Sequence, residues 1–178
     1  LTELLHLLNQ GIYVSKERAK ETLFEFINKA SLHFGYNSVL PFLTETVFLN
    51  LQPDGKSQNS LLELIDEIIK DQFGFKLEDC GTFIQKNYIY IDDILATGKT
   101  FRMNMKSFFQ ENDNLTKLKE KRIRLLSYFF CAHSWGLNNV RFSLKKDLND
   151  DVFMNEHTFR VAFKYVVEKY FIIYIFPP

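Results

Sequence analysis

The sequence is poor in cysteine and glycine, and neither sign of charge is in excess. It contains two cysteines and seven glycines. Cys80 and Cys131 lie far apart and in no metal-binding or redox spacing, so neither a disulfide framework nor a zinc site is indicated. The 22 basic and 22 acidic residues cancel, so the overall charge indicates neither a nucleic-acid partner nor a membrane surface. This cysteine usage fits a reducing compartment, and we expect the protein in the cytoplasm.

Long apolar runs are also missing. The longest, residues 170–176, is much shorter than the ~20 residues that span a bilayer. The start of the chain lacks the basic region and small-residue cleavage site of a secretion signal, and the sequence leaves open what precedes Leu1. What the chain does have is 46% hydrophobic residues over 178 positions, with 19 Phe. That composition predicts one folded domain that buries roughly 70% of the surface of the unfolded chain.

The first half of the chain alternates helical and strand-like patterns. Thr46 to Leu51 form a short apolar run, which predicts a strand that ends in a polar loop over residues 52–59. Ser60 and Glu63 form a capping-box pattern, which predicts that a helix starts there. Ser15 can cap an earlier helix, whose apolar residues recur at helical spacing: Ala19, Leu23, Phe26, Ile27, Ala30 and Phe34.

The same alternation continues to the end of the chain. Residues 88–91 predict a strand, residues 92–100 a loop, and the next helix has a buried stripe of Phe101, Met105, Phe108 and Phe109. Residues 122–133 are almost continuously apolar, as expected of a strand that is covered on both faces. Residues 171–176 suit a last strand. Before them, one helical face would hold Phe159, Ala162, Phe163, Val166 and Tyr170.

Alternating strands and helices predict an α/β fold with a mainly parallel sheet, flanked by helices and joined by right-handed crossovers. We expect a single domain over residues 1–178, with residues 1–45 as a helical N-terminal extension packed on it. A ligand site then belongs beyond the carboxyl ends of the strands.

The stretch YIYIDDILATGKT, residues 88–100, holds the strongest functional signal. Its Gly-Lys-Thr matches the end of a nucleotide P-loop, but that loop needs a glycine five positions earlier, where this chain has Asp93. A carboxylate at that position would repel a polyphosphate. The second such tripeptide, at residues 55–57, fails the same test because Asn50 takes the place of the glycine.

The stretch does fit a loop that binds a sugar monophosphate. The backbone N–H groups of Ala96 to Thr100, at the start of a helix, would point at an anion that the helix dipole favours. Thr97 and Thr100 add hydroxyl donors. Gly98 permits close backbone approach, and Lys99 supplies positive charge.

Asp92 and Asp93 would serve another part of the ligand, because carboxylates accept hydrogen bonds from vicinal ribose hydroxyls. Neighbouring side chains in a strand point to opposite faces, so we expect both acids to reach one ribose only if the strand breaks before them. The structural alternative is an ordinary strand, turn and helix in which Asp-Asp and Thr-Gly are turn residues.

Residues 89–100 resemble the phosphoribosyl-pyrophosphate (PRPP) motif of type I phosphoribosyltransferases: an apolar strand, two acids, two apolar residues, a small residue, then Thr-Gly-x-Thr. Tyr90 is bulkier than the aliphatic residue usual at its place. The resemblance implies that Asp92 and Asp93 bind the ribose 2′ and 3′ hydroxyls and that Ala96 to Thr100 wrap the 5′-phosphate. It implies displacement of pyrophosphate from ribose C1 by a nucleophile. Mg²⁺ would be held mostly by the ligand's own oxygens, without a dedicated metal site.

Enzymes of this family place a second loop against the pyrophosphate. Gly55, Lys56 and Ser57 follow a predicted strand and precede a predicted helix, as that loop requires, and a solvated loop is the alternative. At the end of the third strand, the resemblance places Trp135 as a stacking surface for the base and His133 as a donor or acceptor to the base or nucleophile. The alternatives are a core Trp and a structural His.

The remaining polar signals are weak. His6, His33 and His157 show no ligand spacing. The basic cluster at residues 117–124 contains a glutamate and fits a solvated approach to the third strand, so a nucleic-acid contact is open but not indicated.

The segments PDGKS, YIYIDDILATGKT and FFCAHSWG together look similar to the phosphoribosyltransferase-like effectors of bacterial antiphage systems, some of them associated with retrons. That resemblance implies a toxic or regulatory pentosyltransferase, with a nucleotide or nucleic-acid target and partner proteins such as a reverse transcriptase or an ATPase. Two alternatives stay open. One is a sensor or assembly module that binds PRPP without turnover, and the other is a nucleotide-salvage enzyme.

Overall fold

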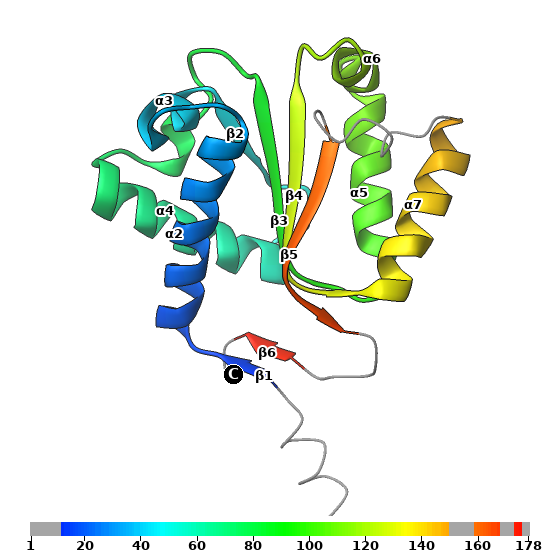
Figure 1. The fold of residues 1–178 in the computed structure, drawn as a ribbon, viewed down its shortest axis with the longest axis horizontal. Coiled ribbons are helices and arrows are strands. Elements are labelled where there is room, and N and C mark those ends of the chain that lie inside the picture. Colours follow the sequence, from blue (N-terminus) through cyan, green and yellow to red (C-terminus); the bar gives the residue numbers. More distant parts are fainter. Residues whose placement is uncertain (1–11, 150–158, 168–172, 176–178) are drawn as a thin grey trace, which may run out of the picture.

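The computed structural model of the chain describes residues 12–149, 159–167 and 173–175 (Figure 1). In chain order the elements are β1 (Ile12–Val14), α2 (Lys16–His33), α3 (Val39–Thr44), β2 (Thr46–Leu49), α4 (Ser57–Phe73), a 3₁₀ turn η1 (Leu77–Asp79), β3 (Asn87–Leu95), α5 (Lys99–Gln110), α6 (Asn114–Lys119), β4 (Arg124–His133), α7 (Ser134–Leu148), β5 (Phe159–Val167) and β6 (Ile173–Ile175).

A four-stranded sheet forms the centre of the molecule, in the order β2-β3-β4-β5. Each neighbouring pair is parallel, and in the central pair Ile89 lies opposite Leu126. The predicted α/β fold with a parallel sheet flanked by helices is thereby confirmed. A separate parallel pair joins β1 to β6, and it lies at the end of the molecule toward which the four strands run (Figure 1).

The helices lie on both faces of the sheet, α2 and α4 on one and α5 and α7 on the other (Figure 1). The step from β2 through α4 to β3 runs in the same direction as the step from β3 through α5 to β4, yet it passes over the opposite face. These two crossovers therefore have opposite hands, so the prediction that all are right-handed is wrong for one of them. Because the chain leaves β2 and β3 toward opposite faces, their carboxyl ends form a topological switch point, where open parallel sheets bind ligands.

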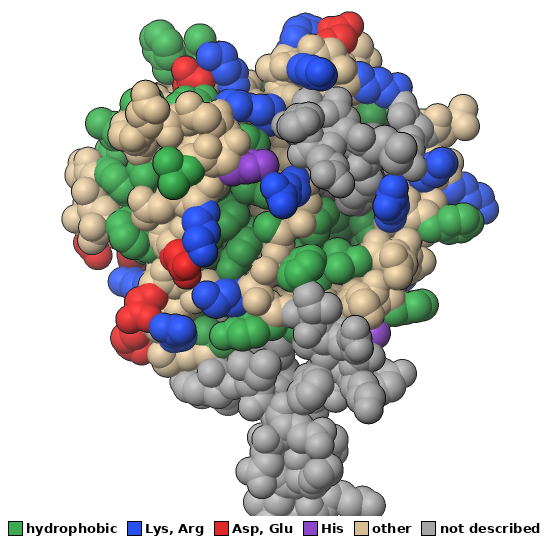
Figure 2. Space-filling view, viewed as in Figure 1, with side chains coloured by type: hydrophobic (Ala, Val, Ile, Leu, Met, Phe, Trp, Pro, Cys, Tyr) green, Lys and Arg blue, Asp and Glu red, His purple; other side chains and the backbone are tan. Residues whose placement is uncertain are grey.

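The face that carries α2 is only partly covered. Figure 2 shows apolar side chains at the surface between α2 and β5, with Lys and Arg side chains beside them. A groove of about 430 Å³ lies there, and its lining includes Phe26 and Lys29 of α2 and Arg160 and Lys164 of β5. None of the residues predicted to bind the ligand lines this groove, so it is separate from the switch point.

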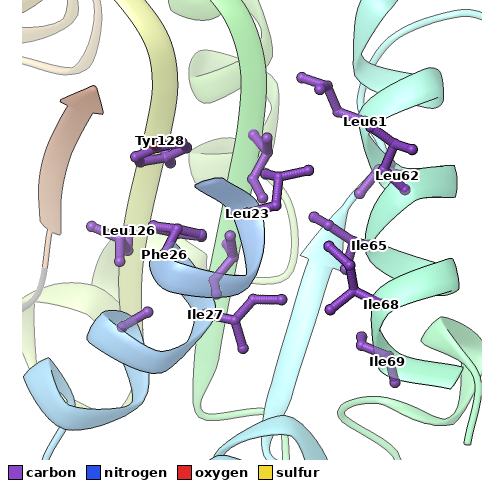
Figure 3. Packing of buried hydrophobic residues seen from close by; sticks show 14 of the residues in the cluster. Leu23, Phe26, Ile27, Leu61, Leu62, Ile65, Ile68, Ile69, Leu126 and Tyr128 are labelled. Carbon is purple, nitrogen blue, oxygen red and sulfur yellow. The ribbon is translucent and has the colours of Figure 1, made fainter. Parts of the chain in front are cut away.

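Two hydrophobic clusters hold the sheet between its helices. The apolar sides of α2 and α4 pack on one face of β3 and β4 (Figure 3). On the other face, the Phe101 ring of α5 lies 5.1 Å from the rings of both Tyr90 and Phe129, measured between centroids. Burial on both faces explains why β4 is almost continuously apolar, as predicted for residues 122–133.

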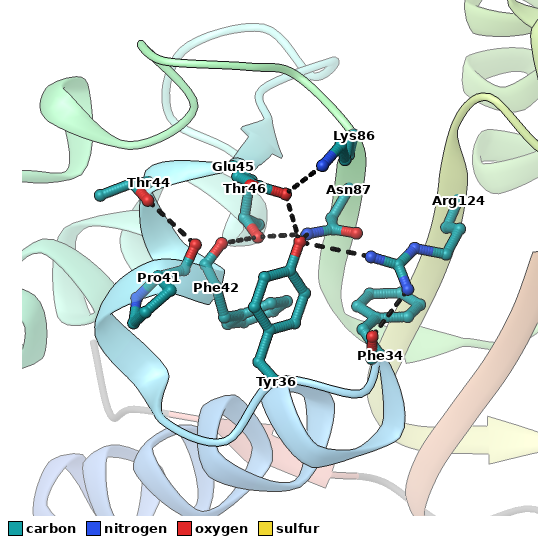
Figure 4. A network of polar contacts seen from close by, with 10 residues as sticks. All are labelled: Phe34, Tyr36, Pro41, Phe42, Thr44, Glu45, Thr46, Lys86, Asn87 and Arg124. Atoms are coloured by element: carbon teal, nitrogen blue, oxygen red, sulfur yellow. Dashed lines mark hydrogen bonds and ion pairs between the residues drawn. The ribbon is translucent and has the colours of Figure 1, made fainter.

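A polar cluster lies at the amino end of the sheet, where β2, β3 and β4 begin (Figure 4). The Tyr36 hydroxyl donates to the Glu45 carboxylate at 2.6 Å and accepts from Arg124 at 3.3 Å. The Lys86 ammonium lies 3.1 Å from the same carboxylate. We call this group the amino-end cluster, and it consists of Tyr36, Glu45, Thr46, Lys86, Asn87 and Arg124.

The helix predicted from the spacing of Phe159 to Tyr170 is wrong. Residues 159–167 instead form β5, which pairs with β4 over most of its length. The segment is rich in β-branched and aromatic residues, and the β4 edge offers it a full set of hydrogen bonds, which outweighs the helical spacing. Tyr170 lies outside the described residues. Of the last strand predicted at 171–176, residues 173–175 form β6, which pairs with β1 rather than with the main sheet.

Three boundaries in the centre of the chain also differ from prediction. The strand predicted over Thr46 to Leu51 ends at Leu49. Helix α4 begins at Ser57, so Ser60 lies inside the helix and does not cap it. Strand β3 continues to Leu95, which leaves only residues 96–98 as the loop before α5. The Ser15 cap is confirmed, since its hydroxyl accepts from the Arg18 N–H at 3.2 Å.

Candidate functional site

Asp92 is the centre of the polar groups at the carboxyl end of β3. It is 6% exposed. Its Oδ2 accepts from Gln52 Nε2 at 2.5 Å and from the Tyr90 hydroxyl at 2.9 Å. Its Oδ1 accepts from the Ser57 hydroxyl and from the backbone N–H of Asp93, both at 3.0 Å. The protein's own donors therefore hold this carboxylate in one orientation.

Asp93 lies in a less favourable environment. Its Oδ1 accepts from the Ile94 N–H at 2.7 Å, and the side chain is only half-buried. Burial and the adjacent Asp92 carboxylate raise the pKa of Asp93 from 3.8 to about 6. A hydrogen bond to Asp92 adds to the shift, because only the protonated form of Asp93 can donate it. Two neighbouring acids with such different surroundings are typical of functional sites.

The prediction that residues 92–95 belong to a loop is wrong, because Asp92 and Asp93 both lie in β3, so the strand break set as the condition for both acids to reach one ribose does not occur. Although neighbouring side chains leave a strand on opposite faces, both acids interact with Ser57, which begins α4. The N-terminal turn of α4 thus brings the two carboxyl groups together at the end of the sheet.

The loop between β2 and α4 is fixed by a buried glutamine that the sequence reading overlooked. Gln58 is fully buried, and its Oε1 accepts from the N–H groups of Leu51 and Gln52 at 2.8 and 3.0 Å. Its Nε2 donates to the Ile91 carbonyl of β3 at 3.0 Å. This side chain holds the loop against β3, and it also explains why α4 starts before Ser60.

Gly55, Lys56 and Ser57, predicted as a pyrophosphate loop, lie in this fixed segment. Gly55 has a φ of 78°, a left-handed conformation that glycine adopts without strain. Lys56 is exposed at the start of α4. Of the three residues, only Ser57 is drawn into the acid pair.

The loop over residues 96–98 packs directly on α7. A side chain at Gly98 would overlap Val140, and one at Gly136 would overlap the Ala96 carbonyl oxygen. The Asn139 amide donates to the Thr97 carbonyl at 2.8 Å. Two glycines and one asparagine therefore fix the path of this loop, and only Gly98 among them was predicted from the sequence.

The same loop presents backbone N–H groups at the start of α5. Ala96, Thr97, Lys99 and Thr100 are exposed, whereas Gly98 is buried. The Lys99 N–H lies 3.4 Å from its acceptor, the Thr97 hydroxyl, and the main-chain bonds of α5 begin with Arg102 N–H to Gly98 O at 2.9 Å. Because the first N–H groups of a helix have no acceptor within it, this turn is suited to bind an anion.

His133 is the last residue of β4, and Trp135 lies in the first turn of α7, whose Gly136 packs on that loop. The His133 Nδ1 accepts from the Trp135 N–H at 3.1 Å and so caps α7. This contact gives His133 a structural role. Trp135 is 60% exposed, which rules out the reading of it as a core residue. Its side chain is therefore open to solvent at the start of α7.

The other candidate groups are placed elsewhere. His33 lies in the last turn of α2, and His6 and His157 lie outside the described residues. Burial raises the pKa of Cys131 to about 11 and that of Cys80 to about 12, so neither thiol is suited to act as a nucleophile near neutral pH. In the part of the chain that the structure describes, no three His, Cys, Asp or Glu residues gather as a metal site requires.

The fold and this site together define a phosphoribosyltransferase-like α/β protein. Comparison with known families agrees, since the model of the family PRTase-CE matches residues 1–171. The chain therefore belongs to PRTase-CE, a phosphoribosyltransferase family. No curated protein and no solved structure matches it. Among the described residues, no helix has the length and apolar character needed to cross a bilayer.

Proposed function

We propose that the protein binds PRPP, or a related ribose 5-phosphate nucleotide, at the switch point between β2 and β3. The observation that carries the proposal is an acid pair near the carboxyl end of β3 with an exposed turn of backbone N–H groups directly after that strand. Within the acid pair, Asp93 supplies an acceptor for a ribose hydroxyl and Asp92 stays bonded to the protein's own donors, while residues 96–100 supply donors for the 5′-phosphate. Trp135 offers a surface for a base or another planar acceptor.

The reaction that fits this site is displacement of pyrophosphate from ribose C1. The C1–O bond to pyrophosphate breaks, the bond to a nucleophile forms, and positive charge develops on the sugar between these events. Carboxylates that are fixed before the ligand arrives stabilise such charge without reorganisation. Lys56, exposed at the start of α4, is suited to receive the departing anion.

Mg²⁺ fits this site only as a companion of the ligand. The four hydrogen bonds to Asp92 occupy its oxygens, so Asp93 is the protein carboxylate with capacity left for a hard cation. The remaining ligands of the ion would be pyrophosphate oxygens and water, and the ion would neutralise the leaving group.

The biological setting that we propose is antiphage defence in the bacterial cytoplasm, with the protein acting as an effector. Its sequence segments 53–57, 88–100 and 129–136 support that setting. A reverse transcriptase or an ATPase is the kind of partner that would control such an effector.

Turnover of PRPP labelled in the ribose tests this function. The wild-type protein should release labelled product and pyrophosphate, and the double variant Asp92→Asn/Asp93→Asn should lose both binding and turnover. Asp71→Asn, which removes an exposed carboxylate from α4, is the matched control and should behave as the wild type. Equal binding of PRPP by the wild type and the double variant would overturn the proposal.

A second function, binding without turnover, is favoured by one specific observation. Asp92 is engaged by the protein's own donors and His133 by the cap of α7, which is the arrangement of a pre-formed binding site that needs no catalytic base. In the same assay, tight binding of PRPP with no product above background would identify a sensor or assembly module.

A further inference from the structure

The Tyr90 hydroxyl uses every hydrogen-bonding site that it has. It accepts from Gln52 Nε2 at 3.0 Å and from Asn104 Nδ2 at 3.2 Å, and it donates to Asp92 Oδ2 at 2.9 Å. A phenol oxygen offers one donor and two acceptor sites. Because two amides fill both acceptor sites, the hydroxyl proton must point at Asp92.

The ring behind this hydroxyl cannot shift. Tyr90 is fully buried, with ring centroids 5.1 Å from Phe101 and 5.9 Å from Phe129. Phe101 belongs to α5 and Phe129 to β4. An aliphatic side chain at this position has no hydroxyl and could not donate to Asp92.

Asp92 and Asp93 differ in how many lone-pair sites remain free to accept a further hydrogen bond. An ionised carboxylate has about four lone-pair sites, and Asp92 receives four donors, from Gln52, Ser57, Tyr90 and the Asp93 N–H. Asp93 accepts the Ile94 N–H and competes with Asp92 for the single Ser57 proton. Within the described residues, Asp93 is therefore the acid that can accept a further donor.

We propose that Tyr90 is a positioning residue, which with Gln52 and Asn104 fixes Asp92 so that Asp93 presents its carboxylate to a ribose hydroxyl. This inference rests on the proposed function and gives the two acids different roles. Asp92 accepts the backbone N–H of Asp93 and so fixes its position, and Asp93 makes the contact to the sugar. Tyr90 acts through them and does not touch the ligand.

The same hydroxyl joins the three segments that build the site. Gln52 comes from the loop after β2, Asp92 from β3, and Asn104 from α5, one turn beyond the N–H groups at residues 96–100. The distance between the acid pair and the phosphate-binding turn is thereby fixed before a ligand arrives. Pre-organisation of this kind strengthens binding because less order has to be created on association.

The test compares ribose 5-phosphate with 2-deoxyribose 5-phosphate, which keeps the phosphate and lacks one of the vicinal hydroxyls. Binding of both is measured by titration calorimetry to wild type, Tyr90→Phe and Tyr88→Phe. Tyr88→Phe is the matched control, because it removes a hydroxyl that donates to Gln85, away from the acids on the same strand. Wild type and the control should prefer the ribose ligand by about tenfold, and Tyr90→Phe should reduce that preference to about twofold.

The experiment distinguishes failure of the proposed function from failure of the role given to Tyr90. If the wild type binds both sugars equally, the acid pair does not hold the ribose, and the proposed function falls with this inference. If the wild type prefers ribose and Tyr90→Phe keeps the full preference, only the role of Tyr90 is overturned. A purely structural role would weaken both ligands in parallel and leave the preference unchanged.

A second variant keeps the inference falsifiable if Tyr90→Phe does not fold. Asn104→Ala removes one of the two donors to the Tyr90 hydroxyl from a half-buried position on α5. It should reduce the preference for ribose by a smaller factor, about threefold. An unchanged preference in this variant would overturn the positioning role.

Discussion

Charged side chains are paired differently at the two ends of the central sheet: opposite charges meet at the amino end, and like charges meet at the carboxyl end. In the amino-end cluster, Glu45 meets Lys86 and the Tyr36 hydroxyl, and the hydrogen bond from Tyr36 holds the pKa of Glu45 below its usual value. At the carboxyl end, two acids lie side by side, and burial with the charge of Asp92 raises the pKa of Asp93 to about 6. The first end stabilises the fold, whereas the second keeps a like-charge pair that destabilises it near neutral pH.

That difference points to the carboxyl end as the candidate site by a criterion other than the sequence motif. A cluster whose only role is structural gains stability by pairing opposite charges. A pair of like charges, of which one is held by four donors and the other is not, persists where a ligand later supplies the compensating groups.

Gly136→Ala should have the largest effect. The new Cβ would overlap the Ala96 carbonyl oxygen, and overpacking against backbone costs about 3 kcal/mol. Chemical denaturation should show this loss, and phosphate-containing ligands should no longer bind because the 96–98 loop is displaced. Asn138→Ala, at an exposed position of the same helix, should change neither property. A Gly136→Ala protein with native stability and native binding would show that the loop does not depend on α7.

Asp93→Asn should stabilise the protein at pH 7 by up to about 3 kcal/mol, because the raised pKa of Asp93 is relieved. A carboxyl whose pKa is raised on folding contributes stability that is complete below its unfolded pKa and is lost as the pH rises through about 6. The advantage of the variant should therefore grow between pH 4 and pH 7 in thermal melts.

Asp92→Asn is the matched comparison for that experiment. It replaces an acceptor of four hydrogen bonds and should destabilise the protein by about 2 kcal/mol. If both substitutions changed stability with the same sign, the assignment of different environments to the two acids would be incorrect.

Arg124→Met should destabilise the fold by about 2 kcal/mol and leave ligand binding intact. The guanidinium donates to the Phe34 carbonyl at 2.7 Å and lies 4.6 Å from the centre of the Phe34 ring, so its removal leaves a partly buried acceptor unpaired. The midpoint of urea denaturation measures the first effect and titration with PRPP the second. A loss of PRPP affinity with unchanged stability would contradict the assignment of a structural role to the amino-end cluster and of ligand binding to the carboxyl end of the sheet.

Glu45→Gln should give the smallest change. The free energy of unfolding of this variant should fall less steeply than that of the wild type as the pH is lowered. Since the folded pKa of Glu45 is lowered, its contribution is present above the unfolded pKa and is lost as the pH falls through the folded value. The variant should therefore be less stable than wild type by about 1 kcal/mol at pH 7 and should approach it at low pH. This slope is opposite in sign to that of Asp93, and melts over pH 3 to 7 would show it. A difference that stayed constant with pH would mean that Glu45 is not held ionised by its partners.

The sequence was sufficient for the elements that local chemistry determines. Alternating patterns predicted the parallel sheet, Ser15 its helix cap, and the apolar run of β4 its burial on both faces. The prediction failed at Phe159 to Val167, where helical spacing and strand composition coincide and only the edge of β4 decides between them.

In the candidate site, the sequence pointed to groups at the end of β3 but not to what holds them. Gln58 and Asn139 act through contacts to residues far along the chain, and no local pattern marks a glutamine or an asparagine for such a role. The bulk of Tyr90 was the one available signal, since a polar ring inside a strand needs a partner for its hydroxyl.

Backbone amide resonances of residues 92–100, followed while ribose 5-phosphate is added, test the central claim most directly. We predict saturable shifts of the amides of Ala96 to Thr100 together with that of Asp93, while the amides of the amino-end cluster stay unchanged. Unchanged resonances over residues 92–100 at saturating ligand, or shifts confined to another part of the chain, would contradict it.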